Sequence, residues 1–140
     1  WTLSRGLGDV YKRQPFTISC IIIGIILFQS FFIAPAINKI INVKEASKFL
    51  RYIWPKFFLI ILILSTLSLF ANYYLAIEKN IIKYFMILCI VFMLVCYFIT
   101  PTINKAKDNS KNKLWAVLHF LTVILTLFTL ILNILIINYW

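Results

Sequence analysis

The run FFLIILILSTLSLFANYYLAI, Phe57–Ile77, decides the fold, because its 21 residues include no charged side chain. An α-helix rises about 1.5 Å per residue, so about 20 such residues cross the ~30 Å hydrocarbon layer of a membrane. Strands of a membrane barrel would alternate apolar and polar residues, and this run does not alternate. Comparable runs occur on both sides of it, at Phe16–Ala34, Tyr84–Thr100 and Leu114–Ile137. The sequence therefore predicts an all-α integral membrane four-helix bundle, with helices at about 16–38, 54–77, 81–100 and 114–138.

Composition supports a lipid environment. The chain is 63% hydrophobic and 13% charged, against about 45–50% and about 25% in soluble domains. Its net charge is +10, but the charges lie in the gaps between the apolar runs, which argues against a nucleic-acid partner and for the lipid bilayer. The cysteines Cys20, Cys89 and Cys96 lie inside apolar runs without a Cys-x-x-Cys pair, which favours buried hydrophobic roles.

The first residues stand apart from the rest. SRGLGDVYKRQ, residues 4–14, resembles an in-frame translation of a transposase-based sequencing adapter. We expect residues 1–14 to be a non-native artefact and residues 15–140 to form the four-helix domain. The alternative is a genuine basic N-terminal tail.

Basic residues are unevenly distributed between the connections. The connections at 39–56 and 102–113 hold nine Lys or Arg residues, whereas the one between them holds Lys79 and Lys83. Cytoplasmic connections carry the excess of Lys and Arg. We therefore expect connections 39–56 and 102–113 in the cytoplasm, both termini outside, and a bacterial inner-membrane location.

Prolines and one amphipathic stretch predict the helix limits. Pro35 and Pro101 are expected to close the first and third helices, and Pro55 to begin the second. The stretch VKEASKFLRYIW, Val43–Trp54, fits either a short helix on the membrane surface or a solvated loop.

A duplicated motif divides the chain into halves. FFIAPAINK at 31–39 and YFITPTINK at 97–105 share six of nine residues, and the shared positions include Pro35, Asn38, Pro101 and Asn104. Ser65, Ser68 and Asn72 likewise correspond to Thr126, Thr129 and Asn133 at an offset of 61 residues. The chain is predicted to be two tandem helical-hairpin repeats, related by an axis along the membrane normal.

Small polar residues recur every three or four positions, which places them on one face of each helix. This polar stripe consists of Ser65, Ser68, Asn72, Thr122, Thr126, Thr129 and Asn133. Such groups avoid lipid, so we expect them in the bundle interior or against another subunit. The favoured role is helix packing. A lining for a small polar ligand or a water path between the repeats is the alternative.

Chemistry-bearing residues are few. His119 is the one histidine, and it is a weak candidate for cofactor or metal binding, with Cys96 as a weak metal-ligand partner, because one side chain does not make a site. No charged residue lies at a helix centre, and no phosphate loop or paired carboxylates occur. The sequence predicts no catalytic residue and no evident cofactor; it favours a protein that is not an enzyme and leaves the enzymatic alternative open.

The quoted motifs, together with YIWPKFFLI and LHFLTVILTL, resemble a bacterial family classed as domain of unknown function 4149, which is similar to eukaryotic transmembrane protein 205. The resemblance implies a four-helix membrane bundle and no activity. A more distant likeness connects the chain to copper-resistance proteins and to the HemJ type of haem-pathway oxidase.

The favoured function is therefore a non-enzymatic helix-packing or partner-binding role, either as a homo-oligomer or with another membrane protein. The alternatives are a haem- or copper-associated membrane oxidoreductase or resistance protein, and a small permease or transporter subunit.

Overall fold

The computed structural model describes residue 10, residues 12–75 and residues 80–140. The first span comprises α2 (Gln14–Phe28), a π-helical segment η1 (Gln29–Ile33) and α3 (Ala34–Ile40). It is followed by α4 (Val43–Tyr74), α5 (Asn80–Asp108) and α6 (Asn112–Tyr139). The four spans are long and apolar enough to cross a membrane, so the prediction of an all-helical, membrane-spanning chain is confirmed. Residues 1–9 and 11 of the segment predicted to be non-native lie outside the described residues, as do residues 76–79 of the second connection.

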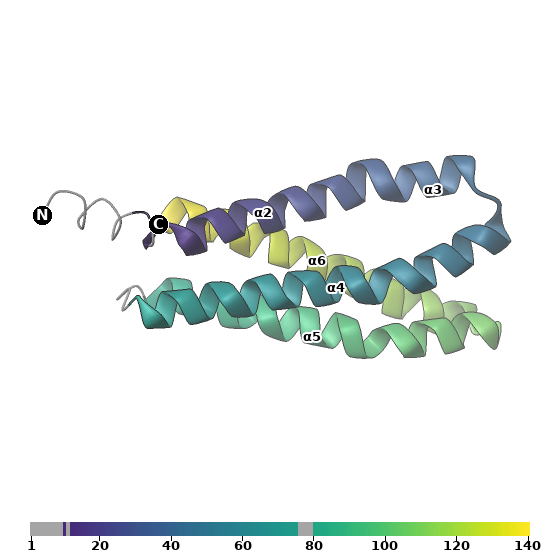
Figure 1. The fold of residues 1–140 in the computed structure, drawn as a ribbon. Coiled ribbons are helices and arrows are strands. Elements are labelled where there is room, and N and C mark those ends of the chain that lie inside the picture. The colour runs from purple at the N-terminus through teal and green to yellow at the C-terminus, as the bar shows by residue number, and fades with distance from the viewer. Residues whose placement is uncertain (1–9, 11, 76–79) are drawn as a thin grey trace, which may run out of the picture.

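The spans form an up-and-down bundle in which sequence neighbours pack side by side (Figure 1). α2 packs on α4 and α6, and α5 also packs on α4 and α6. At the end of the bundle that holds the α3–α4 and α5–α6 connections, α3 diverges from the other helices (Figure 1). We call this end the basic end, because both Lys- and Arg-rich connections lie there.

The predictions that Pro35 and Pro101 close helices and that Pro55 begins the second helix are wrong, because helical structure continues through all three prolines. Pro55 and Pro101 are internal to α4 and α5, and Pro35 lies in the first turn of α3. Proline removes one backbone donor from a helix. Ahead of Pro35, the wider π-helical turn absorbs this loss, since the N–H of Ala34 donates to the carbonyl of Gln29, five residues earlier. Helices inside a packed bundle tolerate such local adjustments.

The stretch Val43–Trp54 is neither a separate surface helix nor a loop, because it forms the first turns of α4. Asn42 caps this helix, and its side-chain oxygen accepts a 3.0 Å hydrogen bond from the backbone N–H of Glu45. An Asn cap satisfies a donor that the first helical turn leaves free. α4 and α5 thus extend beyond the apolar runs and carry, on helical surfaces, six of the nine basic residues of stretches 39–56 and 102–113.

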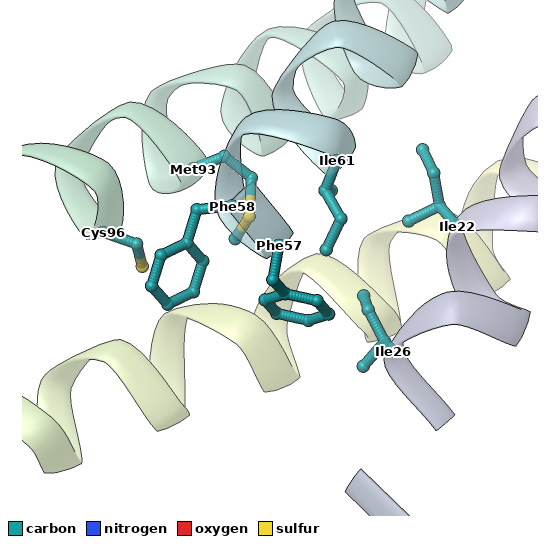
Figure 2. Packing of buried hydrophobic residues seen from close by; sticks show 7 residues of the cluster. All are labelled: Ile22, Ile26, Phe57, Phe58, Ile61, Met93 and Cys96. Carbon is teal, nitrogen blue, oxygen red and sulfur yellow. The ribbon is translucent and has the colours of Figure 1, made fainter. Parts of the chain in front are cut away.

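The core consists of interlocking apolar side chains near the middle of the bundle, and Figure 2 shows them converging from three spans. Their members are Ile22, Ile26, Phe57, Phe58, Ile61, Met93 and Cys96. A second cluster of Ile82, Met86 and Ile136 lies toward the opposite end. Lipid is as apolar as these side chains, so close van der Waals packing, rather than escape from water, stabilises them.

Candidate functional site

Paired groups join α4, α5 and α6 at the basic end. Arg51 of α4 forms a bidentate ion pair with Asp108 of α5, and one of its two hydrogen bonds measures 3.1 Å. Lys107, next to Asp108, lies with its ammonium group 4.2 Å from the ring centre of Trp115 on α6. Cations bind aromatic faces at this separation. The start of α4 and the turn between α5 and α6 are thus held together by charge.

A cavity of about 280 Å³ opens among these groups; half of its sixteen lining residues are polar or charged and half are apolar, and we call it the polar cavity because it is the more polar of the two described here. All four spans line it, including α3 at the end of the first. Its polar and charged lining residues are Asn38, Ser47, Arg51, Thr100, Asn104, Lys107, His119 and Thr122. Thr100 and Thr122 donate to carbonyls of their own helices and Arg51 to Asp108. The amides, Lys107, Ser47 and the imidazole are the remaining polar groups of the lining, and they suit an anionic or strongly polar group.

A second cavity of about 400 Å³ lies between the first span, α4 and α6. Most of its lining is apolar and includes Ile26, Leu27, Phe31, Ala34, Phe57, Val123, Leu127 and Leu130. Phe31, Leu127 and Val123 are 71%, 51% and 39% exposed. Because these three residues lie on the outer surface of the first span and α6, the apolar cavity faces the hydrocarbon that surrounds the bundle.

The two cavities share one wall, made by Trp54, Phe58, His119 and Thr122. Its rings are packed in a defined geometry. The Trp115 ring stacks on His119 with centroids 5.5 Å apart and planes 3° apart, while Trp54 meets His119 edge-on at 6.4 Å. Trp54 also stacks on Phe58 at 5.7 Å. A half-buried imidazole, enclosed by indole rings, therefore stands where the polar and apolar cavities adjoin.

The motif residues of the two halves are placed differently. Asn38 and Asn104 both line the polar cavity. Pro35 and Pro101 are exposed on the outer surface and line neither of the two cavities. Equivalent asparagines of the two motif copies therefore line the same cavity. The motif alone does not predict this shared position.

His119 and Cys96 come from neighbouring helices but do not form a cluster. Cys96 is buried, and its thiol donates weakly to the carbonyl of Thr122 at 3.9 Å. Among the described residues, no three His, Cys, Asp or Glu side chains gather closely enough to hold a metal ion. Binding of a metal or cofactor through His119 and Cys96 stays a prediction.

The polar stripe lies mostly inside the monomer. Ser65, Ser68, Asn72, Thr122, Thr129 and Asn133 are buried and Thr126 is half-buried. On α6 the hydroxyls and the amide donate to carbonyls of their own helix: Thr122 to His119, Thr126 to Thr122, Thr129 to Leu125 and Asn133 to Thr129, at 2.7–2.9 Å. The polar stripe contacts neighbouring helices through sulfur, from Asn133 to Cys89 at 3.6 Å and from Ser68 to Met86 at 3.9 Å. The main role of these short side chains is therefore to let the helices approach closely, and hydrogen bonding between helices is a lesser role.

The sequence did not point to the aromatic wall as a site. Tryptophan is common at membrane interfaces, so neither Trp54 nor Trp115 stands out in the sequence as a site residue. Trp54–Phe58 and Trp115–His119 are each four residues apart, the spacing at which helical side chains stack. That spacing was available in the sequence, whereas the meeting of the two pairs depends on how α4 packs near α6.

Comparisons with known proteins give one family. A family model described as "Domain of unknown function (DUF4149)" matches residues 18–112, which include most of the first span, all of α4 and α5, and only the first residue of α6. No curated protein and no solved structure matches the chain.

Proposed function

Because this chain belongs to the DUF4149 family, whose description assigns no activity, we propose its function from the geometry of the bundle: it is a non-enzymatic membrane protein that binds a partner molecule at its basic end. The single observation that carries this proposal is the pair of adjoining cavities, one polar and one apolar, which share the wall around Trp54 and His119. Ligand sites are typically concave and largely apolar, with a few convergent polar groups.

A stabilisation assay tests this proposal. A ligand that binds only the folded state raises its stability in proportion to the logarithm of ligand concentration. We expect lipids extracted from bacterial membranes to raise the midpoint of thermal unfolding of the detergent-solubilised protein. Ala34→Phe should greatly reduce this rise, because Ala34 lines the apolar cavity and a phenyl ring fills part of it.

Ala36→Phe is the matched control. Ala36 lies two residues along the same helix, is exposed, and lines neither of the two cavities. Its substitution should leave the lipid-dependent rise unchanged. Equal rises in wild type and both variants would contradict binding in the cavity.

The haem- or copper-associated alternative rests on His119, which lines both cavities. The binding proposal expects no Soret band and no stoichiometric copper in protein purified from its native host membrane. Absorbance spectra and metal analysis of that preparation check this, and loss of either signal in His119→Ala would establish the alternative.

The arrangement of the spans supports two tandem hairpin repeats. In such a duplication the first span and α5 would be equivalent, as would α4 and α6. The packing of α2 and of α5 on the same two helices is the arrangement that a twofold axis along the membrane normal produces. The convergence of Asn38 and Asn104 in one cavity supports the same symmetry.

For localisation, we propose a bacterial inner membrane with the basic end in the cytoplasm and both termini outside. The support is the Lys and Arg content of the helix ends around the α3–α4 and α5–α6 connections. A periplasm-active phosphatase fused after Trp140 should be active and a fluorescent protein fused there should be dark. The opposite pair of results would overturn this orientation.

The other proposed partners are membrane components. The exposed apolar surface supports contact with lipid, with a second copy or with another membrane protein, and the basic residues lie at one bundle end rather than on a DNA-binding face. A permease or transporter subunit needs a polar path through the bundle. The donation of the α6 polar groups to carbonyls of their own helix supports packing instead.

A further inference from the structure

We infer that the ligand of the basic end is an anionic phospholipid, with its phosphate-bearing headgroup in the polar cavity and an acyl chain in the apolar cavity. This inference rests on the proposed function and names the ligand class of the same site. Three features carry it: the charge of the polar cavity, the exposure of the apolar cavity to lipid, and the wall that joins them.

The polar cavity matches an anionic headgroup in charge and in donors. Arg51 and Lys107 line it, and because Asp108 already neutralises Arg51 through a bidentate ion pair, Lys107 supplies the positive charge that has no carboxylate partner among the described residues. Lys107 contacts the Trp115 ring and makes no ion pair with any described residue, so its charge is available to a phosphate. Asn38 of α3 and Asn104 of α5 add amide groups to its lining. Phosphate is bound by this combination of cations and neutral donors.

The surroundings strengthen the preference for negative charge. The sequence from 39 to 56 and from 102 to 113 contains nine Lys or Arg residues against Glu45 and Asp108. Basic segments beside a membrane attract anionic lipids electrostatically, whereas a zwitterionic headgroup gains much less. The basic end is therefore suited to discriminate by headgroup charge.

The apolar cavity explains why the ligand is a lipid rather than a free anion. Exposed Phe31 and Leu27 on the first span and exposed Val123 and Leu127 on α6 line it, so a chain reaches it from the bilayer without crossing water. Burying acyl methylene groups against such side chains provides the dispersion contacts that a packed interior offers. A soluble anion would leave this cavity unused.

The wall matches the boundary within a phospholipid. Tryptophan and histidine present an apolar ring and a polar nitrogen, and tryptophan favours the level at which headgroups meet acyl chains. Trp54 and His119 each line both cavities. One amphiphile can therefore contact them along its glycerol region while its two ends occupy different cavities.

Native mass spectrometry of the full chain, titrated in detergent with phosphatidylglycerol or phosphatidylcholine, tests the inference. We expect one phosphatidylglycerol to bind with a dissociation constant several-fold lower than that of phosphatidylcholine. Lys107→Gln should weaken phosphatidylglycerol binding by about fivefold, the effect of one basic residue near a lipid surface. Lys105→Gln is the control, because Lys105 is exposed on the same helix and carries the same charge but does not line the polar cavity.

The outcomes separate the inference from the proposed function. Equal affinity for the two lipids, or equal effects of the two lysine variants, would overturn the anionic-lipid inference. In either case, a loss of binding in Ala34→Phe would still support a ligand site in the apolar cavity. Displacement of the lipid by millimolar inorganic phosphate would show a free-anion site and overturn it as well. Binding of both lipids that Ala34→Phe leaves unchanged would overturn the proposed function itself.

Discussion

Ile61→Ala is expected to lower the free energy of unfolding of the bundle by about 2–3 kcal/mol, near the lower end of the ~2–5 kcal/mol found for such core truncations. Ile61 is 0% exposed and lies at the centre of the larger core cluster (Figure 2). The loss is mostly that of packing contacts around the new cavity. The transfer contribution is small, because the separated helices also place Ile61 in an apolar solvent.

Ile60→Ala provides the matched comparison. Ile60 precedes Ile61 on α4 but is 48% exposed on the outer surface of the bundle. Its truncation should change stability by less than about 1 kcal/mol, since few protein contacts are lost. Reversible unfolding in mixed detergent–SDS micelles, followed by circular dichroism, measures both variants. Similar losses of unfolding free energy for Ile60→Ala and Ile61→Ala would contradict the structure, in which Ile61 faces the core and Ile60 faces outward.

Asn72→Leu is expected to stabilise the bundle by about 1–3 kcal/mol, the cost of burying an unpaired polar group. Asn72 is 0% exposed, and its side chain makes no hydrogen bond with any described residue. Leucine has a similar shape and no polar atoms. The same micelle unfolding assay measures the gain.

Asn133→Leu is the internal comparison, because Asn133 is the counterpart of Asn72 in the second half of the sequence. Its amide donates to the carbonyl of Thr129 at 2.8 Å and to the sulfur of Cys89 at 3.6 Å. Removing these contacts should cost about 0.5–1.5 kcal/mol. A loss of stability in Asn72→Leu as large as that in Asn133→Leu would show that Asn72 has a polar partner in the membrane.

The four spans could be predicted because a membrane makes length and apolarity decisive. An uncharged run such as Phe57–Ile77 must be helical in lipid, where every backbone group has to be paired. The helix ends were harder to predict. Proline normally ends a helix and charge normally ends an apolar membrane-spanning run, yet Pro101 lies inside α5 and charged Lys44 and Glu45 lie in the first turn of α4. Neighbouring helices and the aqueous surface stabilise these extensions, and neither is visible in local sequence.

The site was only partly predictable. Asn38 and Asn104 were singled out by the duplicated motif, and His119 was singled out because it is the one histidine of the sequence. All three line the polar cavity. Phe58, Lys107 and the Arg51–Asp108 pair were not singled out, because aromatic and basic residues are common at membrane interfaces. Their role depends on contacts between helices that are distant in sequence, and the partners of the ion pair are 57 positions apart.

One measurement tests most directly whether a lipid occupies both cavities at the basic end. A protein that keeps Trp54 and carries phenylalanine at Trp1, Trp115 and Trp140 reports on the shared wall alone. Phosphatidylglycerol with brominated acyl chains should quench its fluorescence at substoichiometric lipid in detergent, and Ala34→Phe should abolish this quenching while Ala36→Phe does not. Quenching that appears only at a large lipid excess and is equal in both variants would contradict the site, because it would mean that Trp54 meets lipid only at the outer surface of the bundle.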